Sequence, residues 1–230
     1  MIFGYKLINA SDQAIARAMR ITAFLLLPLM ALCNTSLAEN RINVLNVPDL
    51  SQWDTETFSG ETSYEVTEIE GKAVIKAVSK GTASGLVRHV TIDLNKTPYM
   101  NWSWKIDNIL KGVDETRKSG DDYAARVYVV ISGGIFFWRT RAISYVWASE
   151  QPTGKVWPNA FTGNATMVAV TSGAAQVGQW VVEKRNVLQD IKNLLGIDKT
   201  EINAVAIMSD TDNSGQSATA YYGDIYFTAE

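Results

Sequence analysis

The sequence predicts a mainly β protein folded as a single antiparallel β-sandwich of the jelly-roll kind. Ten short segments are rich in β-branched and aromatic residues or alternate between apolar and polar side chains, and glycine, asparagine, aspartate and proline punctuate them. Many short strands with turns at this spacing are typical of such sandwiches. The expected strands are 42–47, 63–69, 73–79, 86–94, 99–106, 123–131, 142–148, 166–171, 204–209 and 218–228.

One amphipathic helix is expected within residues 182–195. Apolar residues recur there at helical spacing, and Gly196 follows at the position of a left-handed helix cap. We expect this helix to lie across one end or one flank of the sandwich. The apolar positions are Val187, Leu188, Ile191, Leu194 and Leu195.

The first 38 residues have the order of a secretory signal peptide. Arg17 and Arg20 precede a short apolar block, and small residues stand at Ser36 and Ala38. A membrane span needs about 20 residues, and this block is shorter, which favours a cleaved signal peptide. A retained membrane anchor is the alternative interpretation. Residues 1–18 are interpreted as a possible upstream extension, with Met19 the other candidate start. We therefore expect a periplasmic or secreted protein whose single domain covers residues 39–230.

Charge and composition exclude several classes of function. The net charge is −3, and removal of residues 1–38 would make the domain more acidic, which does not suit nucleic acid. Cleavage would also remove the single cysteine, leaving no disulfide or thiolate metal site. His89 is the single histidine, and it is expected on the solvated face of a strand rather than as a catalytic base.

An arginine in the middle of an apolar strand indicates a polar cluster. Arg126 lies in the strand 123–131, and an unpaired guanidinium buried in a sheet costs several kcal/mol. Carboxylates must therefore lie beside it, and a pair between Asp122 and Arg126 is expected. The predicted structural cluster consists of Asp121, Asp122, Arg126, Asp210 and Asp212, with Asp224 a further candidate partner.

Aromatic and polar side chains on several strands suggest a sugar-binding groove. Sugar rings need flat aromatic surfaces for their C–H faces and planar polar groups for their hydroxyls. The tryptophans at 102 and 104 are expected to face the core, which leaves the polar face of that strand for a ligand. The same residues also fit an ordinary half-buried sheet face. The predicted ligand-binding residues are Asn101, Lys105, Arg126, Tyr128, Tyr145, Trp147, Trp157, Tyr222 and Asp224.

Aspartates also raise the possibilities of calcium and of carboxylate catalysis. Asp210 and Asp212 alternate in a turn-rich loop, but Tyr221 stands where an EF-hand needs a glutamate, so an EF-hand is rejected. A calcium site in the sandwich that uses Asp210 and Asp212 remains open against a plain turn. Asp121 and Asp122 point to opposite faces of a strand, which argues against a catalytic pair.

The segment 133–141 combines large apolar residues with two arginines. It is interpreted either as a hairpin tip that meets a ligand, a partner or a membrane surface through residues 135–138, or as a strand packed inward. Apart from the signal peptide, this is the one part of the chain expected to contact a membrane.

The chain carries six distinctive motifs, at 94–98, 101–105, 120–128, 145–149, 157–159 and 209–215. On these motifs it resembles the bacterial family named domain of unknown function 3047. The resemblance covers nearly the whole region after residue 38 and implies a small exported protein of unassigned activity. The strand 101–107 and the segment 222–226 are more weakly similar to the galactose-binding-like sandwiches of carbohydrate-binding modules, although Gly223 departs from their acidic pattern.

Three functions of different class follow from these observations. The first is a non-catalytic module that binds a glycan or cell-envelope polysaccharide. The second is a polysaccharide hydrolase or lyase that acts through aspartates, with calcium as a possible aid. The third is a structural partner in the cell envelope that uses residues 136–138.

Overall fold

The computed structural model describes residues 41–47, 49–135 and 139–230. The predicted signal peptide, its cleavage point and the proposed contact residues 136–138 lie outside the described residues. No helix in the described ranges is long and apolar enough to cross a membrane. The limits of the domain therefore stay a prediction.

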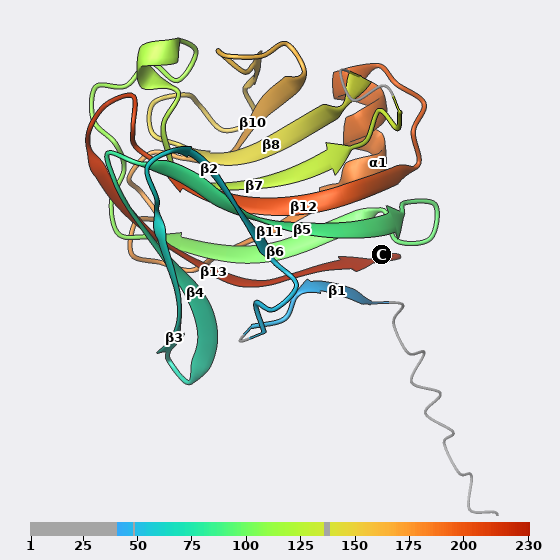
Figure 1. Cartoon of the computed structure of the whole chain (residues 1–230), viewed down its shortest axis with the longest axis horizontal. Helices are drawn as coiled ribbons and strands as arrows, with labels where there is room; N and C mark the ends of the chain where they lie inside the picture. The colour runs from blue at the N-terminus through green and yellow to red at the C-terminus, as the bar shows by residue number, and fades with distance from the viewer. Residues whose placement is uncertain (1–40, 48, 136–138) are drawn as a thin grey trace, which may run out of the picture. The chain divides into compact units, whose positions relative to one another are not determined.

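Two sheets pack face to face and form the predicted sandwich (Figure 1). Sheet A has the order β11-β6-β13-β4-β3, and β1 pairs with β13. Its strands are β1 (Ile42–Leu45), β3 (Ser63–Ile69), β4 (Lys72–Lys80), β6 (Tyr99–Ile106), β11 (Val181–Asn186) and β13 (Ser217–Thr228).

Sheet B has the order β2-β5-β12-β7-β8-β10-β9. All its neighbours are antiparallel except β8 and β10, which run parallel. A 3-10 turn, η1 (Lys118–Gly120), leads into β7. The strands are β2 (Asp54–Ser59), β5 (Ala83–Asp93), β7 (Tyr123–Ile131), β8 (Arg141–Ala148), β9 (Val156–Pro158), β10 (Ala165–Ser172) and β12 (Glu201–Asp210).

The mainly β fold and all ten expected strands are confirmed, with small changes at their ends. Three further strands were not predicted: β2, β9 and β11. Every residue of β2 is exposed. A strand with no buried face needs no alternation of apolar and polar residues, and that alternation is the signal by which strands are predicted. The hairpin turn between β3 and β4 lies at Glu70 and Gly71, which have φ values of 54° and 76°, the sign that a type I′ turn requires.

The predicted helix begins five residues later than expected, at Val187 instead of Val182. Residues 182–186 belong to β11, and the helix begins at Val187 because the Asn186 side chain accepts a hydrogen bond from the Gln189 amide. One α-helical turn, α1 (Val187–Asp190), continues as a π-helical turn, η3 (Ile191–Leu195). Gly196 ends it in the left-handed conformation, as predicted, with φ of 64°. The helix lies at one end of the sandwich (Figure 1).

Aromatic rings fill the core between the sheets. Trp102 and Trp104 of β6 point inward, which confirms their predicted orientation, and both are fully buried. Their ring centroids lie 5.5 Å apart in an edge-to-face arrangement. Across the interface, Trp102 lies 5.5 Å from Tyr145, and Trp104 lies 6.0 Å from Trp147, both of β8. Such pairs add about 0.5–1.5 kcal/mol each to the burial of their area.

Candidate functional site

The strands that were expected to share one polar surface lie in different sheets. Asn101 and Lys105 belong to β6 of sheet A, whereas Arg126 and Tyr128 belong to β7 of sheet B. All four side chains point away from the core, so the two pairs lie on opposite sides of the sandwich. A single groove that contains Asn101, Lys105, Arg126 and Tyr128 was therefore a wrong expectation.

Three predicted ligand-binding aromatic residues are buried between the sheets. Tyr145, Trp147 and Tyr222 have no exposed surface. Each has its polar atom occupied: Tyr145 Oη donates to Asp190 at 2.8 Å, Trp147 Nε1 to the Gly173 carbonyl at 3.1 Å, and Tyr222 Oη to the Met208 carbonyl at 2.7 Å. These residues build the core, which corrects their assignment to a surface groove.

Trp157 and Asp224 also depart from the expected groove. Trp157 is 5% exposed and donates through Nε1 to the Glu115 carbonyl at 3.1 Å. It packs in a small apolar cluster on the outer face of sheet B, with Tyr123 and Met167. Asp224 lies on the outer face of sheet A, where its carboxylate faces Arg41. Among the described residues, neither forms a hydrogen bond or an ion pair with the polar cluster around Arg126.

Arg126 lies on the outer face of sheet B and forms a buried ion pair. Its Nη2 contacts Asp210 Oδ2, and the two side chains are 5% and 1% exposed. The residues are brought together because β7 and β12 are neighbours, with Arg126 opposite Met208. The guanidinium carbon also lies 4.8 Å from the ring centroid of Tyr123 and 5.5 Å from that of Tyr128, an arrangement that favours a cation.

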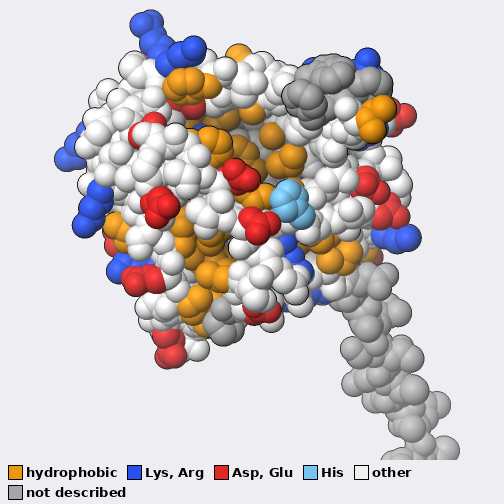
Figure 2. Space-filling model, viewed as in Figure 1, with side chains coloured by type: hydrophobic (Ala, Val, Ile, Leu, Met, Phe, Trp, Pro, Cys, Tyr) orange, Lys and Arg blue, Asp and Glu red, His pale blue; other side chains and the backbone are white. Residues whose placement is uncertain are grey.

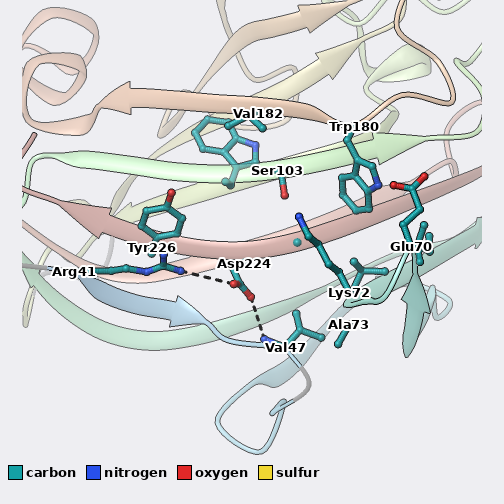
Figure 3. A pocket seen from close by; sticks show the side chains of 14 residues that line it. Arg41, Val47, Glu70, Lys72, Ala73, Ser103, Trp180, Val182, Asp224 and Tyr226 are labelled. Atoms are coloured by element: carbon teal, nitrogen blue, oxygen red, sulfur yellow. Dashed lines mark hydrogen bonds and ion pairs between the residues drawn. The ribbon is translucent and has the colours of Figure 1, made fainter. Parts of the chain in front are cut away.

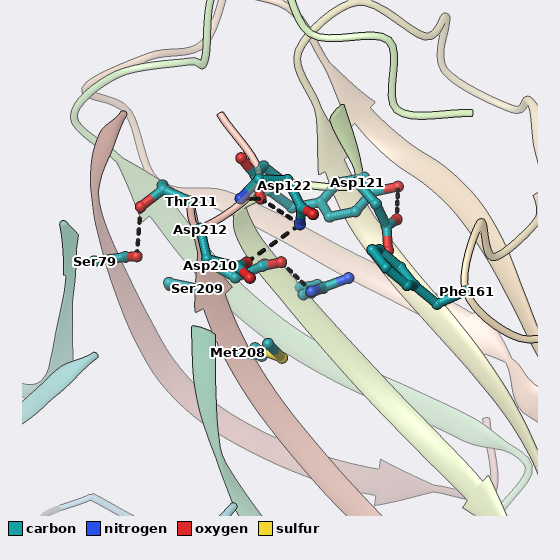
Figure 4. Close-up of polar contacts among 12 residues, drawn as sticks. Ser79, Asp121, Asp122, Phe161, Met208, Ser209, Asp210, Thr211 and Asp212 are labelled. Atoms are coloured by element: carbon teal, nitrogen blue, oxygen red, sulfur yellow. Dashed lines mark hydrogen bonds and ion pairs between the residues drawn. The ribbon is translucent and has the colours of Figure 1, made fainter. Parts of the chain in front are cut away.

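The other predicted aspartates hold the surrounding loops rather than Arg126. Asp122 is fully buried and accepts hydrogen bonds from the amides of Asn213 at 3.1 Å and Ser214 at 2.6 Å. Asp122 thus fixes the turn after β12 (Figure 4), and the expected pair between Asp122 and Arg126 is replaced by the pair with Asp210. Sequence spacing alone could not choose between the two aspartates.

Asp121 lies at the start of β7 and connects two loops. It accepts hydrogen bonds from Tyr123 Oη at 3.0 Å and from Asn159 Nδ2 at 2.8 Å. Burial raises the pKa of Asp121, and the positive charge of Arg126 acts in the opposite direction. A buried carboxyl with a raised pKa is a feature that a site can use for proton transfer.

Two buried polar atoms at this cluster have no partner within the part of the chain that the structure describes. They are Arg126 Nε, a donor, and Asp210 Oδ1, an acceptor. Burial raises the pKa of Asp210 well above its usual range, although Arg126 lowers it. Native proteins rarely leave such atoms unpaired, and both residues line a pocket, which indicates a place where a polar ligand can bind.

The predicted calcium site finds limited support in the geometry. Carboxylate oxygens of Asp122, Asp210 and Asp212 lie within 4.8 Å of one another. Both Asp122 oxygens, however, already accept hydrogen bonds from the turn, and Asp210 Oδ2 pairs with Arg126. Calcium takes about six to eight oxygen ligands. These three carboxylates alone do not fit a closed calcium site.

A cavity of about 470 Å³ opens over the buried ion pair. Figure 2 shows hydrophobic side chains gathered in a hollow on the face that carries β12, β7 and β8, with acidic side chains along it. Phe58 and Phe161 stand at this cavity and are 72% and 55% exposed. Its lining consists mainly of Phe58, Asp121, Arg126, Tyr128, Asn159, Phe161, Met208, Asp210, Asp212 and Asn213.

Phe58 and Phe161 were not predicted as site residues. Both occur in polar segments, DTETFS and NAFTGN. Neither segment has a periodic pattern of apolar residues to which the aromatic residue could belong. That isolation was the available signal, since a large apolar side chain kept in water within a polar loop often marks a contact surface.

Solved structures similar to this one include several β-sandwiches. The family 11 carbohydrate-binding module of a cellulosomal cellulase from Clostridium thermocellum is 10% identical, with a TM-score of 0.47 over 84% of this chain and 96% of that one. The family 30 module of another cellulosomal cellulase from the same organism is 11% identical, with a TM-score of 0.48 over 83% and 98%. The cellulose-induced protein Cip1 is 10% identical, with a TM-score of 0.48 over 79% and 93%.

No curated protein matches the sequence. A family model does: the family described as "Protein of unknown function (DUF3047)" matches residues 51–226, which cover most of the chain and every strand from β2 to β12. The resemblance seen in the sequence motifs is thereby confirmed, and this chain belongs to the DUF3047 family.

Proposed function

We propose that this protein is a non-catalytic, exported binding module that holds a glycan or cell-envelope polysaccharide in the cavity over Arg126. The observation that carries the proposal is a cavity lined by Arg126 and Asp210, whose buried pair leaves two polar atoms unpaired, and by two exposed phenylalanines. Small-molecule sites are typically apolar hollows with a few fixed polar groups, and this cavity has that composition.

The polar floor suits a hydroxyl group. Arg126 Nε is a donor and Asp210 Oδ1 an acceptor, and both are buried without partners in the described residues. A sugar hydroxyl donates one hydrogen bond and accepts others, as any hydroxyl does. A sugar hydroxyl that reaches this floor therefore has both the acceptor that Arg126 Nε lacks and the donor that Asp210 Oδ1 lacks. The cost of leaving these groups unpaired, about 1–3 kcal/mol each, favours occupation of the cavity by such a ligand.

The aromatic walls suit the apolar faces of a sugar ring. Phe58 comes from β2, and Phe161 from the loop between β9 and β10. The two side chains therefore approach the cavity from opposite edges of sheet B. Lys118 Nζ lies 5.3 Å from the Phe161 ring centroid, which helps to hold that ring in place.

The floor of the cavity is held rigidly before any ligand arrives. The Arg126 amide donates to Tyr222 Oη at 3.2 Å, and Asp122 fixes the turn that carries Asn213. Asn159, bound to Asp121, connects the Phe161 loop to the start of β7. Pre-organised polar groups lose little freedom on binding, so a small cavity of this kind can bind with useful affinity.

Calorimetric titration with three hexasaccharides tests the proposal. They are the hexamers of β-1,4-linked glucose, of α-1,4-linked galacturonate and of β-1,4-linked N-acetylglucosamine. We expect at least one to bind, and Phe161→Ala to weaken its binding about tenfold, the equivalent of about 1.4 kcal/mol. Val66→Ala is the matched control, because Val66 is 42% exposed on β3 and lies away from this cavity. Failure of all three sugars and of a wider envelope-glycan panel, or unchanged binding by Phe161→Ala, contradicts the proposal.

A hydrolase or lyase is the second candidate, and the raised pKa of Asp121 favours it. A carboxyl that keeps its proton to higher pH suits a general acid, and Asp212 at the same cavity offers a second carboxylate. This function predicts release of reducing ends from polysaccharides, and its loss in Asp121→Asn that remains folded. Purified protein that binds but never cleaves these polymers would remove it.

A further inference from the structure

A second cavity lies on the opposite side of the sandwich. It has a volume of about 590 Å³ and opens on the outer face of sheet A. Figure 3 shows the Trp180 ring, the Lys72 chain and the Ser103 hydroxyl grouped around it, with Asp224 and Tyr226 nearby. None of these residues contributes to the cavity over Arg126.

A break in the strand register brings two of these side chains to the cavity. β13 pairs with β6 at Tyr222 opposite Trp104 and then shifts, so that Ile225 faces Trp102. Tyr222 and Ile225 are both buried in the core, and the extra residue turns Asp224 and Tyr226 outward. Bulges of this kind often re-aim side chains at functional sites.

Gly223 at this bulge keeps the bottom of the cavity open. A Cβ atom at this position would clash with the Ser103 Oγ atom. A glycine inside a strand normally weakens it, and such a glycine often marks a place where another group approaches closely. Here it leaves room for the Ser103 hydroxyl, which lines the cavity together with Lys72 (Figure 3).

The polar groups of this cavity are ordered on one side and free on the other. Arg41 stacks on Tyr226, with its guanidinium carbon 3.6 Å from the ring centroid, and its Nη2 lies 3.7 Å from Asp224 Oδ2. Lys72 Nζ and Ser103 Oγ, in contrast, have no hydrogen bond or ion pair within the described residues. The cavity thus offers free donors opposite a positioned carboxylate.

We infer that this cavity is a second saccharide-binding site. The half-buried Trp180 indole supplies a flat surface for the C–H face of a pyranose, while Lys72, Ser103 and Asp224 reach its hydroxyls. The inference depends on the proposed function in one respect only. If both cavities bind sugar, one molecule holds two glycan segments on opposite faces and bridges them.

The same three hexasaccharides test the site by calorimetric stoichiometry. We expect two sugars per wild-type protein, and one of the two sites to be weakened about tenfold or more in Trp180→Ala and in Phe161→Ala. Lys72→Gln should weaken the remaining site in Phe161→Ala at least threefold. Lys76→Gln is its matched control, because Lys76 lies on the same strand but pairs with Glu65 at 3.1 Å. Thermal unfolding verifies that each variant is folded.

The outcomes separate this inference from the proposed function. Loss of all binding in Phe161→Ala together with unchanged binding in Trp180→Ala overturns the second site and leaves the first. Loss of all binding in Trp180→Ala together with unchanged binding in Phe161→Ala supports the second site and overturns the first. If both bind, long polysaccharide mixed with wild-type protein should scatter light by cross-linking, whereas either variant should not. The absence of scattering by wild type at two-to-one stoichiometry contradicts bridging.

Discussion

Two arginine–aspartate pairs stand at the two cavities, and they differ in burial. The side chains of Arg126 and Asp210 are 5% and 1% exposed, whereas those of Arg41 and Asp224 are 41% and 44% exposed. The same two residue types therefore form one ion pair that is shielded from water and one that is exposed to it. In the first pair the surrounding protein fixes the charges, and in the second pair water surrounds them.

The difference in burial determines what each pair can do. Removing one partner of a buried pair leaves a charge that neither water nor protein compensates. Because separating the two partners costs so much, the buried pair keeps one arrangement. An exposed pair contributes little energy and can exchange its partner for a ligand group. We therefore interpret the Arg126 cavity as a pre-formed site and the Asp224 cavity as an adaptable one.

The largest expected effect is that of Arg126→Met. This change leaves Asp210 buried without its counter-ion, close to the carboxylates of Asp121 and Asp122. We expect the free energy of unfolding in urea to fall by about 3–5 kcal/mol. A loss below about 1 kcal/mol would show that water or a proton neutralises Asp210 once Arg126 is gone, and the contrast between the two pairs would disappear.

A double variant controls for packing. Arg126→Met combined with Asp210→Leu removes both charges and keeps apolar volume at the cavity floor. Replacement of a whole buried pair is often neutral, so we expect the double variant to recover at least half of the lost stability. Glycan binding in the first cavity should be lost in the single variant and should not return in the double variant, because both unpaired polar atoms are then gone. Recovery of binding would contradict the assigned role of the floor.

An intermediate effect is expected for Asp121→Asn, and it should depend on pH. Burial raises the pKa of Asp121 in the folded protein, so the folded state keeps this proton where the unfolded chain has lost it. The stability that this group contributes is fully present below its ordinary pKa of about 3.9 and is lost as pH rises through the raised value.

Urea unfolding of both proteins between pH 4 and neutrality measures this dependence. We expect wild type to exceed the asparagine variant by about 1–2 kcal/mol at the acid end. There the protonated carboxyl carries no buried charge, whereas the asparagine amide places two N–H donors beside the donors Tyr123 and Asn159. The difference should shrink as pH rises. Asp93 and Asp114, whose pKa values are lowered by local hydrogen bonds, are present in both proteins and cancel. A constant or growing difference contradicts the burial argument.

The sequence predicted most strands well because each of these strands carries its own local pattern of apolar and polar residues. Alternation along β6 correctly placed Trp102 and Trp104 in the core, and alternation along β7 placed Arg126 on the face away from it. Both results depend on period two alone, which is a local property. The same reasoning predicted that an acidic partner is needed but left five aspartates as candidates.

The site was harder to predict because strand pairing is not local. Nothing in the sequences of β6 and β7 shows that they belong to different sheets, so residues of opposite faces were combined into one groove. The bulge after Tyr222 then reversed the face of Asp224, which a strict alternation cannot anticipate. Phe58 was missed for the opposite reason, since β2 is exposed throughout and shows no pattern.

The smallest expected effect is that of Arg41→Met, the exposed counterpart of Arg126→Met. The Arg41 guanidinium lies 3.7 Å from Asp224 and stacks on Tyr226, but both charged side chains remain largely in water. We expect the free energy of unfolding in urea to change by less than about 1 kcal/mol, and less still in high salt, which screens exposed pairs. Arg126→Met, measured in the same buffers, is the control and should keep its large loss in high salt. A cost of about 2 kcal/mol or more for Arg41→Met would mean that this pair is as rigid as the buried one, and the second cavity could not adapt its charges to a sugar.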